Sequence, residues 1–418
     1  MRVSLPVVLA VLFALVPALS WAQQAATRTE LIQLLRKDKQ ARLWPERTSG
    51  IVKMVNNFMA RGFLEGVESG KGTNGPQFVL GGMRSGNGTT FGLGYRRVDL
   101  WGERLSFRGT ARGTVRKAYM FDVELGFPRL KTERADLMLY AKYENSPLMD
   151  FYGNGPDSNR ANRSSYRLED TGIDLSGRYR VWKDLYLGAT GGVYLSNTGR
   201  GQRSGFPSTD EKFNPEDVPG LADQASFLRA GGFLQYDWRD NPRGPRRGGN
   251  YYARHLRYWD QTLGRHTFNR LEWGIEQYIP YFNESRVIAL RVGSVMTWAR
   301  DGQTVPFYLQ ATLGGNEYLR GFDRYRFYDQ NSFLVSAEHR WHIFSGGYAA
   351  MFFETGKVSD KASQVNIHNL EYSGGIGFRF TIRNTVIMRI DTAVSREGLR
   401  FMWTFSDMWA KGAGWTGR

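Results

Sequence analysis

The sequence predicts an all-β membrane protein: a 16-stranded antiparallel transmembrane β-barrel preceded by a short helical segment. Three observations lead to this prediction. The chain opens on an apolar export signal, its apolar residues recur with a period of two from residue 76 onward, and the connections between strands alternate between tight turns and long polar loops. A transmembrane barrel is consistent with all three observations. Strands that cross lipid must pair with a neighbour on both sides, and a closed barrel provides this pairing.

Composition limits the alternatives. The 418 residues include 49 Gly and no Cys, and the formal net charge is +16. The lack of Cys excludes a disulfide scaffold, a thiolate zinc site and a cysteine nucleophile. The mean hydropathy of −0.46 excludes a bundle of membrane-spanning helices, which requires several apolar runs of roughly 20 residues. The same average suits a barrel, since it combines a lipid-facing stripe with a charged lumen and polar loops.

Residues 1–22 have the pattern of a secretory signal peptide. The charged Arg2 precedes an apolar run over 3–19. The small residues Ser20 and Ala22 then stand three positions and one position before the expected cleavage point. The alternative is an uncleaved anchor helix. We therefore expect export through the periplasm and a location in the bacterial cell outer membrane.

The segment 23–75 is predicted to hold two amphipathic helices. The first covers 29–42, and its apolar side is made by Leu31, Ile32, Leu34 and Leu35. The second has apolar residues three and four positions apart, which is helical spacing: Ile51, Met54, Val55, Phe58, Met59 and Phe63. We expect a periplasmic or lumen-plugging helical segment. The alternative is a helix on the membrane surface, favoured by the neighbouring basic residues.

The barrel is predicted over 76–406, followed by a C-terminal tail at 407–418. In the last strand Leu399, Phe401 and Trp403 alternate with polar or smaller residues, which is the pattern of a half-buried strand. Similar alternation gives sixteen strands, centred on 76–83, 89–97, 103–113, 116–126, 135–145, 164–180, 184–198, 224–238, 249–259, 266–278, 285–299, 331–344, 347–357, 371–381, 384–393 and 398–406.

The connections alternate in length along the chain. The tight ones are 180–184, 281–285, 344–347 and 382–385. The long polar ones are 145–163, 199–222, 300–330 and 359–369. Short turns at one end and long loops at the other are typical of outer-membrane barrels. A soluble β-sandwich, which is the alternative for such strands, gives no reason for this alternation.

Three segments of the predicted barrel carry distinctive motifs. The loop between the eleventh and twelfth strands contains Leu319, Arg320, Gly321 and Phe322. The turn between the eighth and ninth strands contains Asp237, Arg239, Asp240, Asn241, Pro242, Arg247 and Gly248. The thirteenth strand contains Phe352, Phe353, Glu354, Thr355 and Gly356. Together they resemble motifs of the BamA/TamA-type outer-membrane superfamily, also called the bacterial surface antigen family. In the second segment, the alternative is a basic turn shaped by its prolines and glycines.

The resemblance implies a barrel-only member, because 23–75 leaves no room for periplasmic substrate-binding repeats. It implies a part in assembling or translocating outer-membrane protein or lipid, with a polypeptide or lipid as substrate. It also implies that the loop forms a plug and that Arg320 docks on acidic groups of the barrel wall. We assign Glu338 and Glu354 as its partners.

The residues support this pairing independently of the resemblance. Glu338 and Glu354 fall on the polar parity of adjacent strands, so both are expected to face the lumen. The planar guanidinium of Arg320 suits carboxylates. The alternative is that the two glutamates only neutralise arginines of the wall itself, namely Arg340, Arg379 and Arg389.

Other functions stay open at this point. A passive pore gated by the N-terminal helices is one, and an outer-membrane enzyme is another. The five histidines show no zinc-ligand spacing backed by further ligands, so we predict no catalytic residue, no metal and no cofactor. The expected partners are outer-membrane lipids, including lipopolysaccharide, and the barrel assembly machinery during biogenesis. Nucleic acid is not expected, because the basic residues form no single cluster.

The first predicted strand is a further element of the leading hypothesis. It is short and contains Gly81 and Gly82, so its hydrogen-bonded ladder should be weak. A weak seam between the first and last strands is the expected route for a substrate.

Overall fold

The computed structural model describes residues 28–42, 74–130, 134–282, 285–344, 346–382 and 385–405. The chain forms two compact units, Met1–Ser49 and Gly50–Arg418, which are described separately. In the first, helix α2 (Arg28–Arg42) occupies the range of the first predicted helix. The second predicted helix, the signal peptide and the tail lie outside the described residues. None of the described helices has the length and apolar character needed to span a membrane.

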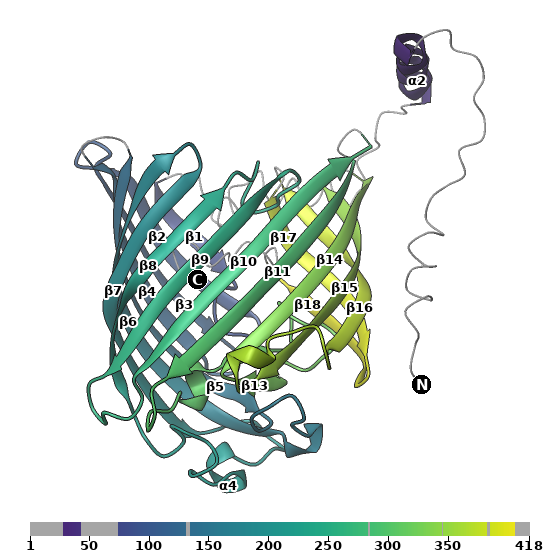
Figure 1. The fold of residues 1–418 in the computed structure, drawn as a ribbon. Helices are drawn as coiled ribbons and strands as arrows, with labels where there is room; N and C mark the ends of the chain where they lie inside the picture. Colours follow the sequence, from purple (N-terminus) through teal and green to yellow (C-terminus); the bar gives the residue numbers. More distant parts are fainter. Residues whose placement is uncertain are drawn as a thin grey trace. The chain divides into compact units, whose positions relative to one another are not determined.

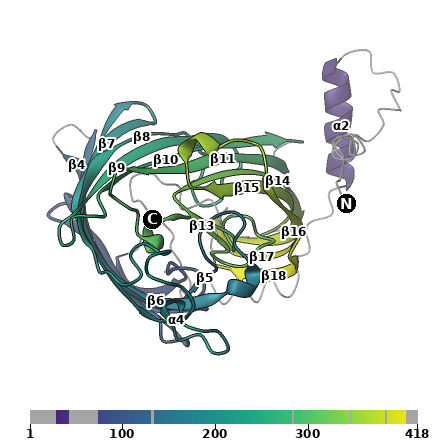
Figure 2. The same cartoon turned by 60° about the horizontal axis from the view of Figure 1, so that its bottom comes forward.

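The second unit is a 16-stranded antiparallel sheet rolled into a barrel (Figures 1 and 2). Each strand pairs with the next one along the chain, in the order β1 to β11 and then β14 to β18. The strands are β1 (Gly75–Leu80), β2 (Thr90–Leu100), β3 (Leu105–Thr114), β4 (Tyr119–Leu130), β5 (Ala135–Phe151), β6 (Ser164–Trp182), β7 (Leu185–Arg200), β8 (Ser226–Asp237), β9 (Gly248–Asp260), β10 (Phe268–Tyr281), β11 (Arg286–Ala299), β14 (Asn331–Phe344), β15 (Gly347–Ser359), β16 (Glu371–Ile382), β17 (Thr385–Ser395) and β18 (Gly398–Thr404). The predicted fold class is confirmed.

The alternation in each strand sorts side chains between lipid and lumen. In β18, Leu399, Phe401 and Trp403 are exposed on the outer face, whereas Met402 is buried on the inner one. In a bilayer this exposed apolar face contacts lipid rather than water. The charged side chains fall on the opposite parity and therefore gather inside the barrel, where the site is built.

The strand boundaries differ from the sequence prediction by up to six residues, and the differences in β1 and β5 have a clear physical cause. β1 ends at Leu80 and not at residue 83, because Gly81 and Gly82 adopt positive φ angles of 76° and 86° that end an extended strand. β5 continues to Phe151, six residues past its predicted end, because 146–151 keeps pairing with β6 beyond a bulge. A register shift of this kind leaves no signal in the polar–apolar pattern.

The long connections hold the remaining short elements. These are η1 (Arg160–Asn162), α4 (Thr209–Lys212), η2 (Phe307–Leu309), β12 (Ala311–Leu313), β13 (Phe327–Asp329) and η3 (Ala362–Gln364). β12 and β13 pair with each other inside the 300–330 loop. In Figure 1, α4 and β13 lie at the same end of the barrel, so the long loops gather there, as the sequence predicts.

The long loops pack against one another. Their shared apolar cluster consists of Met149, Phe151, Tyr166, Leu168, Val218, Phe307, Tyr308 and Tyr328. The Tyr328 hydroxyl donates to the carbonyl oxygen of Asp150 (2.9 Å), and the amide of Gly155 donates to the Tyr328 carbonyl (2.7 Å). The amide of Phe307 donates to the Pro219 carbonyl (2.8 Å). The 300–330 loop is thus anchored to the two loops that flank β6 and β7.

The two ends of the sheet meet at the seam, the line between β1 and β18. Within the ranges that the structure describes, the hydrogen-bonded order runs from β1 to β18 and includes no ladder between these two strands. They are nevertheless close, since a Cβ atom placed on Gly81 would lie 3.2 Å from the carbonyl oxygen of Phe405. Both strands are short, with six and seven residues.

Candidate functional site

The 300–330 loop folds back so that its tip meets the inner wall of the barrel. Leu319, just before Arg320, has a φ of 50°, which is uncommon for a residue other than glycine. The amide of Phe322 donates to the carbonyl of Leu319 (2.9 Å), which closes the turn. Such a conformation persists only where the surroundings hold it. Here the surroundings are the charged inner faces of β14, β15 and β17.

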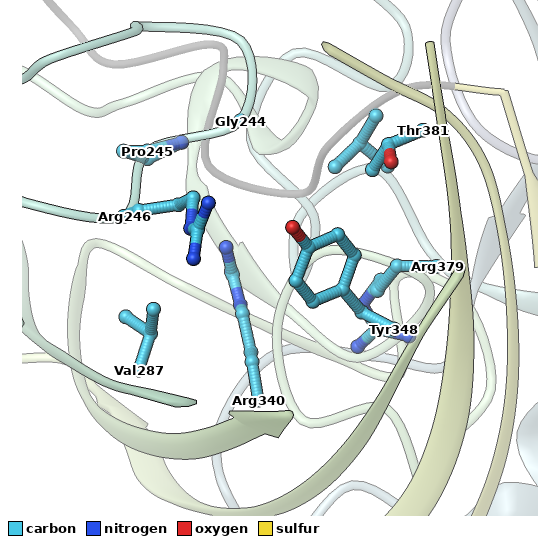
Figure 3. Close-up of a pocket in the computed structure, with 9 residues that line it drawn as sticks. Gly244, Pro245, Arg246, Val287, Arg340, Tyr348, Arg379 and Thr381 are labelled. Carbon is cyan, nitrogen blue, oxygen red and sulfur yellow. The ribbon is translucent and has the colours of Figure 1, made fainter. Parts of the chain in front are cut away.

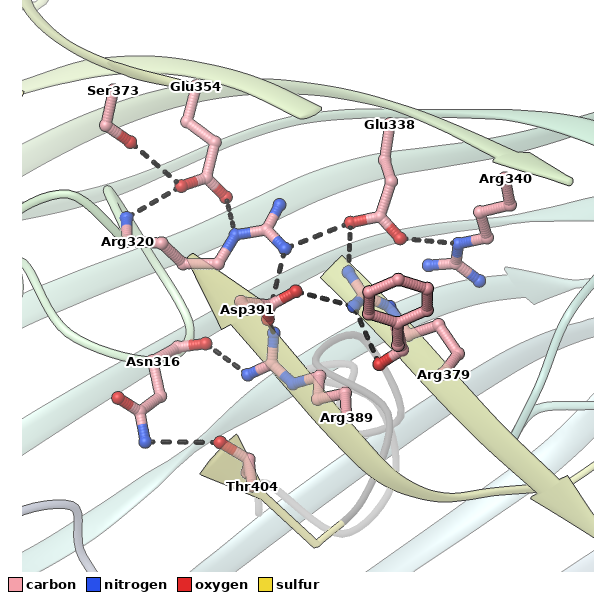
Figure 4. A network of polar contacts seen from close by, with 11 residues as sticks. Asn316, Arg320, Glu338, Arg340, Glu354, Ser373, Arg379, Arg389, Asp391 and Thr404 are labelled. Atoms are coloured by element: carbon pink, nitrogen blue, oxygen red, sulfur yellow. Dashed lines mark hydrogen bonds and ion pairs between the residues drawn. The ribbon is translucent and has the colours of Figure 1, made fainter. Parts of the chain in front are cut away.

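Arg320 is fully buried and bonded to the wall (Figure 4). Its amide donates to Glu354 Oε2 (2.7 Å) and its Nε to Glu354 Oε1 (3.0 Å). Its Nη1 donates to Glu338 Oε2 (3.1 Å) and, at 3.5 Å, to Asp391 Oδ2. The guanidinium also lies over the ring of Phe352, with Cζ 3.3 Å from the ring centroid. Three strands thus contribute a carboxylate to one arginine.

The two residues after Arg320 fix the loop tip in place. A Cβ on Gly321 would lie 2.7 Å from Ser395 Cβ and 2.8 Å from Ser373 Cβ, so only glycine fits between these strands. The Ser395 hydroxyl donates to the Gly321 carbonyl (2.8 Å). Phe322 is fully buried and packs on Phe327 with ring centroids 5.2 Å apart. The loop tip is therefore held by charge, by close fit and by apolar packing together.

The wall carboxylates serve both the loop and the wall. Glu338 Oε1 accepts from Arg340 Nε (2.7 Å), and its Oε2 accepts from Arg379 Nη2 (2.9 Å) as well as from Arg320. Glu354 instead accepts from Arg320 and from the Ser373 hydroxyl (3.3 Å). Glu338 therefore binds Arg320 of the loop and also pairs with arginines of the wall, so that both alternatives considered for it hold. The bonds of Glu354 go instead to the loop tip and to Ser373.

Sequence reasoning missed the roles that three residues play in the site, although it placed one of them, Phe352, in a motif. Asp391 accepts from Arg320, Arg379 and Arg389. Phe352 stacks on Arg320, and the carbonyl of Asn316 accepts from Arg389. Asp391 could have been found, because it shares the inward parity of Arg389 two positions earlier in β17. The roles of the other two depend on where the loop arrives in space.

The β8–β9 turn is a second built element, at the short-turn end of the barrel. Arg239 donates through Nε and Nη2 to the two oxygens of Asp237 (both 2.8 Å) and through Nη1 to Glu276 Oε2 (3.3 Å). Asp240 Oδ1 accepts from the amides of Asn241 (2.9 Å), Arg246 (3.0 Å) and Arg247 (3.2 Å). The motif residues therefore form the internal skeleton of this turn.

Pro242 and Gly248 complete the motif of the turn. Pro242 is exposed, and Gly248 has a φ of 101° as the first residue of β9. The amide of Val386, at the start of β17, donates to the carbonyl of Arg243 (3.0 Å). The turn is thus attached to a strand that stands far from it in the sheet order.

The described ranges contain no group of three or more His, Asp or Glu side chains placed to hold a metal ion. The charged groups of the site are instead paired with one another inside the barrel. Such an arrangement can hold a loop in place, and it presents no open ligand position.

Comparison with known proteins gives the family. Residues 84–397 match the Omp85 superfamily domain. The chain belongs to the Omp85 superfamily. It is therefore a bacterial outer-membrane β-barrel, and the resemblance to the BamA/TamA-type family is confirmed. No curated protein matches the chain in sequence.

Two solved structures share the fold of this Omp85 chain. One is BamA from Haemophilus ducreyi lacking POTRA domains 1–3, with a TM-score of 0.59 and 15% identity, over 80% of this chain and 70% of that one. The other is CdiB from Escherichia coli, with a TM-score of 0.51 and 12% identity, over 79% of this chain and 61% of that one. The chain thus spans about three fifths of the CdiB chain.

Proposed function

We propose that this Omp85 barrel takes part in assembling or translocating outer-membrane protein or lipid, and that its substrate passes at the seam between β1 and β18. The observation that carries the proposal is the missing ladder at the seam within the described residues. In lipid, unpaired backbone groups are costly, so an unpaired edge favours exchange with the edge of an incoming strand.

The anchored loop supports the same mechanism. The tip of the 300–330 loop is bound through Arg320 to β14, β15 and β17. Of these strands, β17 pairs with the seam strand β18. Asn316 of the same loop also donates to the hydroxyl of Thr404 in β18 (3.2 Å). A plug tied to the last strand would keep the barrel closed to small solutes while the seam opens.

A seam lock tests the proposal directly. A Cβ on Gly81 would lie 4.0 Å from Phe405 Cβ, within the roughly 3.5–4.5 Å that a disulfide requires. The chain has no native Cys, so the pair Gly81→Cys and Phe405→Cys supplies the only thiols. We expect the oxidised pair to remove function in cells that lack the native protein, and reductant to restore it. The readout is the protein and lipid content of the outer membrane.

The single-cysteine variants are the controls, because each carries one substitution and cannot form the bond. The reduced double variant shows how much function is lost by placing a Cys at the positive φ of Gly81 in the absence of the bond. A locked barrel that supports normal outer-membrane content would contradict the seam mechanism. If removal of the whole protein leaves that content unchanged, the assembly function itself is wrong.

The finer assignments belong to the same proposal. Residues 1–22 direct export through the periplasm and 23–75 form a periplasmic or lumen-plugging segment. The barrel contacts outer-membrane lipids, including lipopolysaccharide, and is inserted by the barrel assembly machinery. The proposal assigns the chain no enzymatic activity. A passive pore gated by the N-terminal helices is the competing function, and ion conductance distinguishes it.

A further inference from the structure

The strand arginines described above face the lumen. Beneath the β8–β9 turn, Arg340 and Arg379 line a cleft inside the barrel (Figure 3), and both pair with carboxylates of the wall. On β9, Arg254 also faces inward and donates to Glu272 Oε2 (2.6 Å). Arg257 stands three residues later on the same strand, and this odd separation places it on the opposite, lipid-facing side.

The burial of its neighbours agrees with an outward direction for Arg257. Leu256 and Tyr258 are buried in an apolar cluster inside the barrel, whereas His255 is exposed. The guanidinium of Arg257 lies over the ring of Trp259, with Cζ 5.5 Å from the ring centroid. Because Trp259 stands two residues nearer the long-loop end of β9, the side chain extends toward the membrane surface and away from the hydrocarbon core.

The two following strands add polar and aromatic groups next to Arg257. Pairing places Asn269 of β10 beside Arg257, and Trp298 of β11 beside Asn269. Trp298 is 44% exposed, and its ring centroid lies 5.8 Å from that of His255. Tryptophans near strand ends mark the border between lipid and water. We call this group of residues the outer-face site, and its members are Arg257, Trp259, Asn269 and Trp298.

The charge of Arg257 has no carboxylate beside it on the lipid-facing side of β8 to β11, four strands that the structure describes in full. Its Nε is buried and finds no hydrogen-bond acceptor in the described part of the chain. A buried donor without a partner is costly, so an acceptor supplied by a lipid would be stabilising. The carboxylates of these strands all fall on the lumen-facing parity, and they are Asp237, Asp260, Glu272 and Glu276.

We propose that the outer-face site binds the phosphorylated sugar headgroup of an outer-leaflet lipid, which is the chemistry of lipopolysaccharide. The guanidinium of Arg257 suits phosphate, with which it forms paired hydrogen bonds. The side-chain amide of Asn269 supplies a further donor, and the tryptophan rings offer flat apolar surfaces to the sugar. The site lies at the long-loop end of the barrel, which is the extracellular end in outer-membrane barrels.

The position of the site in the sheet is compatible with an opening seam. β9 to β11 stand in the middle of the sheet order, whereas β1 and β18 are its two ends. A lipid bound there holds a part of the wall that is far from the seam in this order. The inference rests on the proposed contact of the barrel with outer-membrane lipids and not on the assembly function, so a failed seam lock would leave it standing.

The first test measures how much lipopolysaccharide each variant retains. The full-length protein is extracted from the outer membrane in mild detergent, and the co-purified lipopolysaccharide is determined per barrel. We expect the native protein to retain it and Arg257→Gln to lose most of it. The heat-modifiable mobility of the barrel on gels establishes that each variant is folded.

Arg286→Gln is the matched control for retention. Arg286 is exposed on the same lipid-facing side, and its Cζ lies 4.8 Å from the ring centroid of Phe282. It stands at the first residue of β11, at the short-turn end, and therefore meets the periplasmic leaflet, where lipopolysaccharide is not the resident lipid. This variant should retain as much lipopolysaccharide as the native protein.

The second test titrates lipid A into the delipidated protein and follows thermal unfolding. Lipid A with both phosphates should raise the unfolding temperature, and lipid A without phosphates should do so far less. Arg257→Gln should weaken the apparent affinity for the phosphorylated form about tenfold to a hundredfold, the effect of one charge-assisted hydrogen bond. Arg257→Lys, which keeps the charge without the fork, should fall between this variant and the native protein.

Three outcomes would overturn the inference. The first is a native protein that neither retains lipopolysaccharide nor is stabilised by lipid A. The second is equal retention by Arg257→Gln and Arg286→Gln. The third is that lipid A without phosphates stabilises the native protein as strongly as the phosphorylated form, which would show that the acyl chains alone account for binding.

Discussion

The guanidinium of Arg320 is fully buried, and three carboxylates accept hydrogen bonds from it. Removing one partner of a buried ion pair is costly, because the remaining charges stay in a poorly solvated site. We expect Arg320→Ala to lower the free energy of unfolding by about 3–5 kcal/mol. Arg320→Lys should recover part of this loss, since it keeps the charge but not the fork or the stacking on Phe352. Unfolding of the barrel in detergent, followed by heat or denaturant, measures both.

Arg324→Ala is the control for this prediction. Arg324 lies on the same loop, where burial lowers the pKa of its guanidinium and the charges of Arg203 and Arg116 lower it further. Its Nε makes no hydrogen bond within the described ranges. Its removal should leave stability nearly unchanged. Equal stability of the native protein, Arg320→Ala and Arg324→Ala would show that Arg320 does not hold the loop.

Asp329, on β13 in the same loop, gives a pH dependence. Burial raises the pKa of its carboxyl to about 6, the charge of Asp360 adds to the rise, and a hydrogen bond from the Gln330 amide opposes it. In the unfolded chain the pKa is about 3.9. The folded state therefore binds the proton more tightly, so this group disfavours folding increasingly as the pH rises from about 4 to about 6.

Asp329→Asn should remove that penalty, because the amide oxygen can still accept from Gln330. The variant should unfold at a higher temperature than the native protein at pH 7, and the difference should vanish near pH 4. Thermal unfolding at a series of pH values measures this. A difference that stays constant with pH would mean that Asp329 does not titrate in this range.

At the scale of elements, the β8–β9 turn depends on one side chain. A single oxygen of Asp240 accepts three backbone amides. We expect Asp240→Ala to increase amide hydrogen exchange across 241–247, and to cost about 1–2 kcal/mol by analogy with the loss of a helix cap. Asp240→Asn keeps an acceptor oxygen and should exchange like the native protein. Identical exchange in all three proteins would mean that the turn is held by other contacts.

Individual strands also show which features of the structure could be predicted from the sequence and which could not. Alternation such as Leu399–Phe401–Trp403 is a local signal, and it sufficed to predict the sixteen strands. The extension of β5 past a bulge was missed, because bulges are set by pairing with the next strand. Asp391 was missed as a partner of Arg320, although its parity was visible, because parity gives the face and not the neighbour across the lumen.

At the scale of the whole molecule, the 300–330 loop is held at two points, Arg320 and Arg326. Beyond Arg320, the buried Arg326 donates to Glu397 Oε1 (2.7 Å) and to the Ser158 hydroxyl (2.9 Å), which joins the loop to the β17–β18 turn and to the β5–β6 loop. The loop is thus connected to the turn before the seam strand β18 as well as to the wall. Release of either connection should open the lumen.

Ion conductance in planar bilayers distinguishes the plugged barrel from a passive pore. If the loop is a plug, the native protein should conduct little, and Arg320→Ala should open frequently, because a freed loop exposes a polar lumen. Glu397→Gln, which weakens the pair with Arg326, should give a smaller increase and serves where Arg320→Ala folds poorly. Arg324→Ala, on the same loop, should behave like the native protein. A native protein that conducts steadily, with traces unchanged by Arg320→Ala and by Glu397→Gln, would contradict the plug and favour the pore, because the conductance of a lumen that is already open does not change when the loop loses its anchors.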